Sequence, residues 1–173
     1  VESGVAQIQF KRVSKQEKIG NKRPKLLFST AIESPIANGP AALVNHLNGS
    51  MEWAIQDEKN NLKLISNAGR NTWTRPIDGP IQFPIHQVDL YKNSRLQMAY
   101  TTKNSFEVID RNAKPVQPFS SKLNNPLPLA VFDYENTRDY RLVLVNQNTL
   151  ELRDRKFKKV SGFNRTKAKL KYA

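Results

Sequence analysis

Residues 86–119 read HQVDLYKNSRLQMAYTTKNSFEVIDRNAKPVQPF, and the same order of residue types recurs 44 positions later and 44 positions earlier. The later copy is AVFDYENTRDYRLVLVNQNTLELRDRKFKKVSGF, residues 130–163, and the earlier one is ALVNHLNGSMEWAIQDEKNNLKLISNAGRNTWTRPI, residues 42–77. Matching side chains lie at this spacing at four sets of positions: Asn60, Asn104 and Asn148; Leu62, Phe106 and Leu150; Leu64, Val108 and Leu152; Val44, Val88 and Phe132. Differences in length fall in the turns, where a repeated β unit tolerates them. The constant spacing predicts a repeat architecture.

Apolar residues alternate with polar ones inside each copy, as in Met51, Trp53 and Ile55. This period of two is typical of β-strands with one face in a core and the other toward solvent or a polar layer. Four short strands in every 44 residues predict an all-β, β-propeller-like fold of three to four four-stranded antiparallel blades. Helical repeats would need apolar spacings of three and four, and a β-sandwich would give no reason for a constant period.

The pattern predicts strands near 41–47, 51–57, 61–66, 71–76, 85–91, 95–102, 105–110, 114–119, 129–134, 140–146, 149–154 and 158–163. Four prolines, Pro80, Pro84, Pro126 and Pro128, are expected in the links between blades, where proline suits a connection and not a central strand. Matching positions on the apolar faces predict a core of Trp53, Ile55, Leu64, Leu96, Met98, Val108, Leu142, Leu144 and Leu152.

Three complete units are predicted: residues 41–84, residues 85–128, and residues 129–173 with a basic C-terminal end. Residues 1–40 are either a divergent or partial blade or a linker with one strand. At most four units are present, and propellers have four to eight blades, so we expect an incomplete propeller. Its open ends would be protected by charge or covered by remaining blades of a longer parent protein.

The net charge of +13 lies entirely at the two ends of the chain. Residues 1–25 carry +5, residues 153–173 carry +8, and residues 26–152 hold twelve basic and twelve acidic residues. This distribution argues against a basic stripe across the folded body, so nucleic acid is not the favoured partner. The chain has no cysteine, which excludes disulfides, thiolate metal sites and thiol nucleophiles. No apolar run is long enough for a membrane-spanning helix.

Three segments carry a family resemblance: QDEKNNLKLISNAGRNTWTRPIDGPI (56–81), QVDLYKNSRLQMAYTTKNSFEVIDRNAKPV (87–116) and LAVFDYENTRDYRLVLV (129–145). They resemble the pyrroloquinoline-quinone-type and outer-membrane-assembly-type propeller blades. They are most similar to the C-terminal propeller repeats of large uncharacterised envelope proteins of Bacteroidetes-type bacteria. The resemblance covers about residues 40–165. It implies a periplasmic or cell-surface location and no particular reaction. The metal-binding acids and stacking Trp of quinone-binding members have no counterpart, so no cofactor is expected.

Asp89 and Asp133 occupy equivalent positions after a first strand, with Asn45 in the earliest copy. If the innermost strands meet at a central channel, these acids could hold a cation there. A more frequent role for such acids is to cap a turn or to pair with a basic neighbour. His46 and His86 are not equivalent under the repeat and lack ligand-like spacing. No catalytic residue is predicted, because no arrangement of a nucleophile with a base is recognisable.

Most aromatic residues coincide with Met, Val or Leu in the other copies, which marks them as core. Tyr91 is the exception, since Glu135 is its counterpart, and it is predicted to be exposed and to bind a ligand or partner. The leading hypothesis is a non-catalytic interaction or scaffold module whose partner is a protein or the remaining blades of its parent. The two alternatives are an electrostatic binder of polyanion or nucleic acid through the basic ends, and a cation or enzyme site using Asp89 and Asp133.

Overall fold

The computed structural model describes residues 25–146 and 149–163 and the backbone of residues 6–11. Within these residues the prediction of an all-β protein is confirmed, since they form strands and no helix. The strands are β1 (Ala6–Lys11), β2 (Leu26–Ile32), β3 (Ile36–Val44), β4 (Met51–Asp57), β5 (Asn61–Ile65), β6 (Asn71–Pro76), β7 (Ile81–Val88), β8 (Gln97–Thr102), β9 (Ser105–Ile109), β10 (Ser121–Lys122), β11 (Ala130–Phe132), β12 (Arg141–Asn146) and β13 (Thr149–Asp154).

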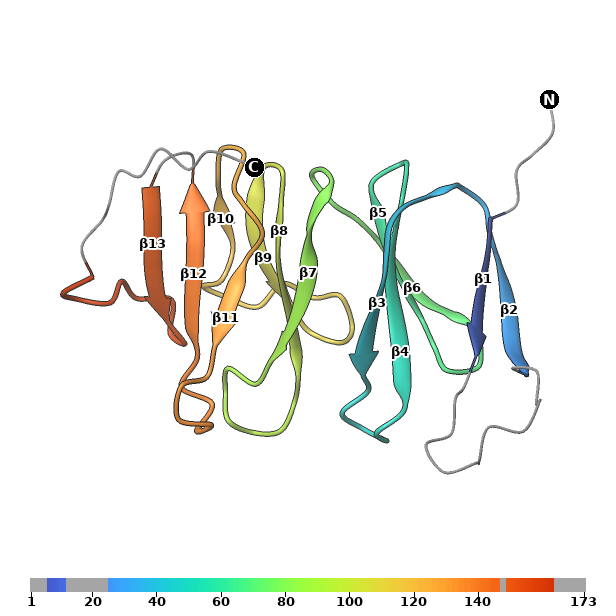
Figure 1. The fold of residues 1–173 in the computed structure, drawn as a ribbon, viewed down its shortest axis with the longest axis horizontal. Helices are drawn as coiled ribbons and strands as arrows, with labels where there is room; N and C mark the ends of the chain where they lie inside the picture. Colours follow the sequence, from blue (N-terminus) through green and yellow to red (C-terminus); the bar gives the residue numbers. More distant parts are fainter. Residues whose placement is uncertain (1–5, 12–24, 147–148, 164–173) are drawn as a thin grey trace, which may run out of the picture.

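The strands form a row of antiparallel layers along the longest axis of the molecule (Figure 1). β1 and β2 make a hairpin at one end. Sheet I has the order β3-β4-β5-β6, sheet II consists of β7 to β10, and sheet III has the order β11-β12-β13. Each sheet is an up-and-down meander. The chain enters each sheet at an edge strand: β3 in sheet I, β7 in sheet II and β11 in sheet III. The row is open, because sheet III does not return to the hairpin.

The strand boundaries follow the 44-residue period. The third strands of sheets I, II and III begin at Asn61, Ser105 and Thr149, and the first strands end at Val44, Val88 and Phe132. The turn after each third strand places a residue with positive φ at the same position: Gly69 (φ 76°), Ala113 (φ 62°) and Phe157 (φ 63°). Isolated bridges between Ile109 and Pro115 and between Arg153 and Lys159 are again 44 residues apart. Local backbone geometry therefore repeats even where side-chain identity does not.

Three hydrophobic clusters fill the spaces between successive layers. The first, between the hairpin and sheet I, contains Ile32, Ile55 and Ile65. The second joins Leu62 and Leu64 of sheet I to Met98 and Tyr100 of sheet II, and the third joins Phe106 and Val108 of sheet II to Leu142 and Leu144 of sheet III. Every sheet thus has a backward face toward the preceding layer. The opposite face, which we call the forward face, lies against the next layer in sheets I and II.

For the inner strands, neither face is turned toward solvent. All six residues of β8 are buried, because sheet II is covered on both faces by neighbouring sheets. Six of the nine predicted core residues are buried. The other three are half-buried: Trp53 lies near the hairpin, Leu96 directly precedes β8, and Leu152 lies on the forward face of sheet III.

Two predicted fourth strands and one proline assignment are also wrong. Residues 114–119 contain only a bridge at Pro115, and the fourth strand of sheet II is instead the short β10. Residues 158–163 contain only the bridge at Lys159, so the described part of sheet III has three strands. Pro84 lies inside β7, not in a link, where the pairing register shifts between Gln82 and His86. A proline is accommodated there because the irregular ladder does not use its missing N–H.

The hairpin covers the backward face of sheet I. Phe28 of β2 packs on Trp53 of β4 with ring centroids 5.3 Å apart. The same ring lies over Gly69, where a Cβ atom would come within 2.6 Å of Phe28 Cδ2. The described row therefore has one end covered by its own chain.

Candidate functional site

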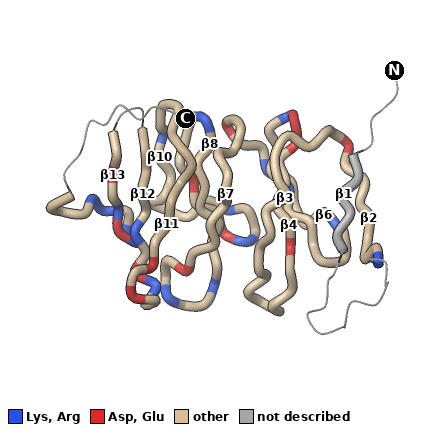
Figure 2. Tube along the Cα trace, in the orientation of Figure 1, with Lys and Arg blue, Asp and Glu red and all other residues tan. Residues whose placement is uncertain are grey.

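Two kinds of loop share one edge of the row, which is the lower edge in Figure 1. We define this loop edge as the first-to-second-strand loops 45–50, 89–96 and 133–140 together with the third-strand turns 66–70, 110–114 and 154–158. Figure 2 shows basic and acidic residues interleaved along this edge of sheets II and III. Most buried residues are apolar, so charged side chains lie mainly at the surface, including these loops.

Asp89 and Asp133 form the same turn in sheets II and III. The carboxylate of Asp89 accepts the backbone N–H groups of Asn93 (3.0 Å) and Ser94 (2.7 Å). Asp133 accepts those of Thr137 (3.1 Å) and Arg138 (3.0 Å). Short acids are suited to this role because their oxygens reach backbone donors a few residues ahead. The turn-capping role of the two acids is therefore present in the structure.

Asp89 also joins two sheets. Its side chain is 2% exposed, and Arg138 Nη1 of the following sheet lies 2.8 Å from its Oδ2. N–H donors thus surround Asp89, which is an environment for an anion and not for a cation. Among the described residues there is no group of three or more His, Asp or Glu side chains placed to hold a metal ion. Asn45, the counterpart in sheet I, accepts Leu47 N–H and donates to Glu52.

Both histidines make hydrogen bonds between sheets. His46 Nδ1 accepts the N–H of Leu96 (3.2 Å), which links sheet I to sheet II. His86 Nε2 donates to the carbonyl of Leu129 (2.7 Å), which links sheet II to the connection into sheet III. Their irregular spacing in the sequence is consistent with two separate structural roles.

Tyr91, the residue singled out as a binding aromatic, lies in a groove of about 650 Å³. We call it groove II; its apolar walls are Leu47, Tyr91, Leu96, Pro115 and Val116, and its polar lining includes Asn93, Arg95 and Asn112. The side chains of Tyr91 and Leu47 are 55% and 72% exposed. The prediction that Tyr91 is exposed is therefore confirmed, while its ligand stays a prediction.

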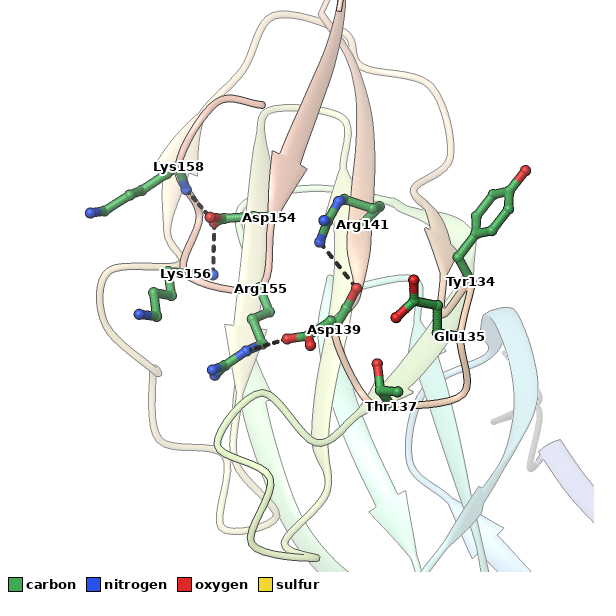
Figure 3. Close-up of a pocket in the computed structure, with 9 residues that line it drawn as sticks. All are labelled: Tyr134, Glu135, Thr137, Asp139, Arg141, Asp154, Arg155, Lys156 and Lys158. Carbon is green, nitrogen blue, oxygen red and sulfur yellow. Dashed lines mark hydrogen bonds and ion pairs between the residues drawn. The ribbon is translucent and has the colours of Figure 1, made fainter. Parts of the chain in front are cut away.

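A second groove of about 610 Å³, groove III, lies on sheet III (Figure 3). It is lined by Tyr134, Glu135, Thr137, Asp139, Arg141, Asp154, Arg155, Lys156 and Lys158. Hydrogen bonds from Lys92 (2.9 Å) and Arg155 (2.8 Å) hold the pKa of Asp139 below its usual range. Asp154 accepts the backbone N–H groups of Lys156 and Lys158, as Figure 3 shows. Tyr134 extends away from the groove and is 93% exposed.

The two grooves are copies of one feature. Seven of the nine positions that line groove III lie 44 residues after a position that lines groove II. The chemistry differs at these pairs: Tyr91 corresponds to Glu135, Arg95 to Asp139, and Asn112 to Lys156. A repeated backbone thus presents two neighbouring grooves with different side chains.

The forward face of sheet III is the second candidate surface. Its apolar residues are Val143, Leu150, Leu152, Val160 and Phe163, and all lie 44 residues after members of the cluster beneath sheet III: Ala99, Phe106, Val108, Val116 and Phe119. The five residues of sheet II are between 0% and 8% exposed. The five of sheet III are half-buried or, for Phe163, 38% exposed. No described residue layers over this face as sheet III layers over sheet II.

Sequence reasoning missed several residues of these surfaces. The equivalence with Val88 and Leu90 in the repeat predicts a core position for Phe132 and Tyr134, yet they are 49% and 93% exposed. Their counterparts, Val88 and Leu90, are buried because sheet III covers them, and Phe132 has no such cover among the described residues. The lone position of Tyr134 in a polar loop was the available signal.

Residues 57–61 form the hairpin turn between β4 and β5. Asp57 accepts the N–H groups of Lys59 and Asn61 and pairs with Lys63 at 3.3 Å. Burial alone would raise the pKa of Asp57, but the hydrogen bonds from Asn61 and Lys63 hold it below its usual value.

Comparison with protein-family models and with curated proteins found no match to this chain. None of the described residues forms a helix that could cross a membrane.

Proposed function

We propose that this chain is a non-catalytic interaction module of the β-propeller type, whose forward face on sheet III receives a further antiparallel sheet. That sheet would come from a protein partner or from the remaining blades of the parent protein. The resemblance to envelope propeller repeats supports the fold assignment and a periplasmic or cell-surface location. Fractionation of cells that produce the natural protein would test the location.

The observation that carries the proposal is the equivalence between the forward faces of sheets II and III. In sheet II this face is covered by Leu142 and Leu144 of the next sheet. In sheet III the same positions hold apolar side chains of similar or larger size, including Val143 in place of Ala99. Burying a large apolar side chain is worth about 1.5–3 kcal/mol, so five such positions favour a covering layer.

The preceding interfaces indicate the chemistry of the covering layer. Each backward face inserts two large side chains from its second strand, Met98 and Tyr100 in sheet II and Leu142 and Leu144 in sheet III. The occupant we expect therefore presents large apolar residues two apart on a central strand, as in these sheets. The charged groups of such a sheet would lie at its loops, as they do here.

The test is the binding of the apolar dye 8-anilinonaphthalene-1-sulfonate by the full chain. We expect clear fluorescence enhancement by the parent protein and loss of most of it in Leu150→Ser/Leu152→Ser. The matched control is Leu26→Ser/Leu27→Ser, which removes two leucines that are 48% and 52% exposed on the hairpin at the other end. Equal loss in both variants, or no loss in the first, would show that the forward face is not an accessible apolar surface.

A further inference from the structure

We propose that the loop edge of sheets II and III is a separate binding site for an extended acidic polypeptide segment. Apolar side chains of the segment occupy groove II, and its carboxylates pair with Arg95, Lys156 and Lys158.

Four cationic side chains along this edge, those of Arg95, Arg141, Lys156 and Lys158, have no carboxylate partner among the described residues. No described residue forms an ion pair with the side chains of Arg95, Lys156 or Lys158. Among the described residues, Arg141 donates only to the backbone carbonyls of Asp139 and Tyr140. Two of the three acids of groove III are engaged: Asp139 pairs with two cations, and Asp154 accepts two backbone N–H groups, while Glu135 has no ion pair with a described residue. The edge therefore offers positive charge that the protein itself does not neutralise.

Groove II supplies the apolar part of the site. Val116 is buried in the cluster under sheet III, and Leu47 and Tyr91 project from two different loops at the groove with large exposed areas. Tyrosine is enriched at binding surfaces because its ring buries a large area and its hydroxyl tolerates water. A side chain such as Leu or Phe from a partner would fill this groove.

The two grooves are held in a fixed relation. Lys92 from the groove II loop pairs with Asp139 of groove III at 2.9 Å, and Arg155 Nη1 of groove III donates to the carbonyl of Leu90 at 3.1 Å. Arg138 adds the bond to Asp89 described above. Such preorganisation lowers the entropic cost of binding a ligand that crosses both grooves.

The interleaved charges favour a polypeptide over a nucleic acid. Groove III is lined by four basic and three acidic residues, and groove II by two basic residues and one acidic residue. A nucleic acid carries a phosphate on every nucleotide and would set some of them against Glu135 and Asp154. A polypeptide places carboxylates only where its sequence requires them, with apolar or neutral residues between.

The probe is a fluorescein-labelled synthetic peptide that repeats the unit Leu-Glu-Gly-Glu, with binding followed by fluorescence anisotropy. We expect binding that weakens as salt is raised, and no binding of the matching Leu-Lys-Gly-Lys peptide. Lys156→Ser/Lys158→Ser should lower the affinity about three- to tenfold, as expected for two exposed ion pairs. Tyr91→Ala should weaken the Leu-containing peptide but not a Ser-Glu-Gly-Glu peptide.

The matched control is Lys103→Ser/Lys122→Ser, which removes two exposed lysines at the opposite edge. An equal effect of the two double variants would overturn the proposal, because general charge would then explain binding. If single-stranded oligothymidylate binds as tightly as the acidic peptide, the polypeptide assignment is wrong. The Leu150→Ser/Leu152→Ser variant should keep full peptide binding, so failure of this site and failure of the forward face are distinguishable.

Discussion

Replacement of Gly69 by alanine tests whether the N-terminal hairpin is docked on sheet I. Gly69 has φ +76°, and an added Cβ would lie 2.6 Å from Phe28 Cδ2. Two costs are expected. A non-glycine residue in the left-handed region costs about 1–2 kcal/mol, and overpacking against the Phe28 ring adds about 1–3 kcal/mol. Ala113 and Phe157 occupy the same backbone position in sheets II and III, so the turn itself accepts a side chain.

Gly49→Ala is the matched control, because Gly49 has φ +72° and an added Cβ would meet nothing within 4 Å. Urea denaturation of the two variants at one temperature then separates backbone strain from the contact with Phe28. We expect Gly69→Ala to be less stable than Gly49→Ala by at least about 1 kcal/mol. The difference should shrink in a Phe28→Ala background, as a double-mutant cycle would show. Equal stability of the two single variants would refute the docked hairpin.

Three further outcomes follow from the same structure. Leu142→Ala should cost about 2–5 kcal/mol of unfolding free energy and Leu152→Ala clearly less, because Leu142 is fully buried and Leu152 lies on the forward face; equal costs in urea titrations would mean that the forward face is covered. Asp57 has a folded pKa below its unfolded value, so its contribution to the free energy of unfolding is complete above about pH 5 and is lost as the pH falls through about 4 and below. The difference in stability between the parent and Asp57→Asn should therefore become smaller in acid. A difference that grows in acid would contradict the direction of the pKa shift. Lys156→Ser/Lys158→Ser/Lys159→Ser should promote self-association at low salt, since it removes charge beside the outer edge of β13. Unchanged light scattering would show that charge does not protect that edge from association.

The 44-residue period of the fold could be predicted from the sequence because the residues that repeat form turns and strands through local interactions. Asn60 and Asn104 mark turns before third strands, and Leu64 and Val108 mark apolar positions within them. Turn chemistry and strand pattern act over a few residues, so they survive without tertiary information. For the same reason, the turn after each third strand keeps its positive φ although Gly69 gives way to Ala113 and Phe157.

Which faces are buried could not be predicted in the same way. Alternation along a strand marks its apolar face but does not show that Thr101 and Gln97 on β8 are buried as well. Their burial depends on sheets that lie on both sides of sheet II. Likewise, the grooves are formed by residues up to 71 positions apart, from His46 to Gln117. The sequence contains only the 44-residue spacing of their lining residues. This spacing shows that the two grooves are equivalent only after the fold has placed the loops on one edge.

The neutral middle of the chain illustrates why net charge does not measure available charge. Residues 26–152 hold twelve basic and twelve acidic residues. This balance excludes a net charge in this segment, but it does not exclude that positive and negative side chains lie on different parts of the surface. In the folded chain Asp89 is buried and paired with Arg138, and Glu52 is buried and paired with Arg111, so neither acid presents free charge at the surface. Arg95, in contrast, is exposed and has no such partner among the described residues. Cations outside these pairs thus remain on the loop edge beside Tyr91, and a sequence with no net charge in its body still presents a local surface that attracts acidic ligands.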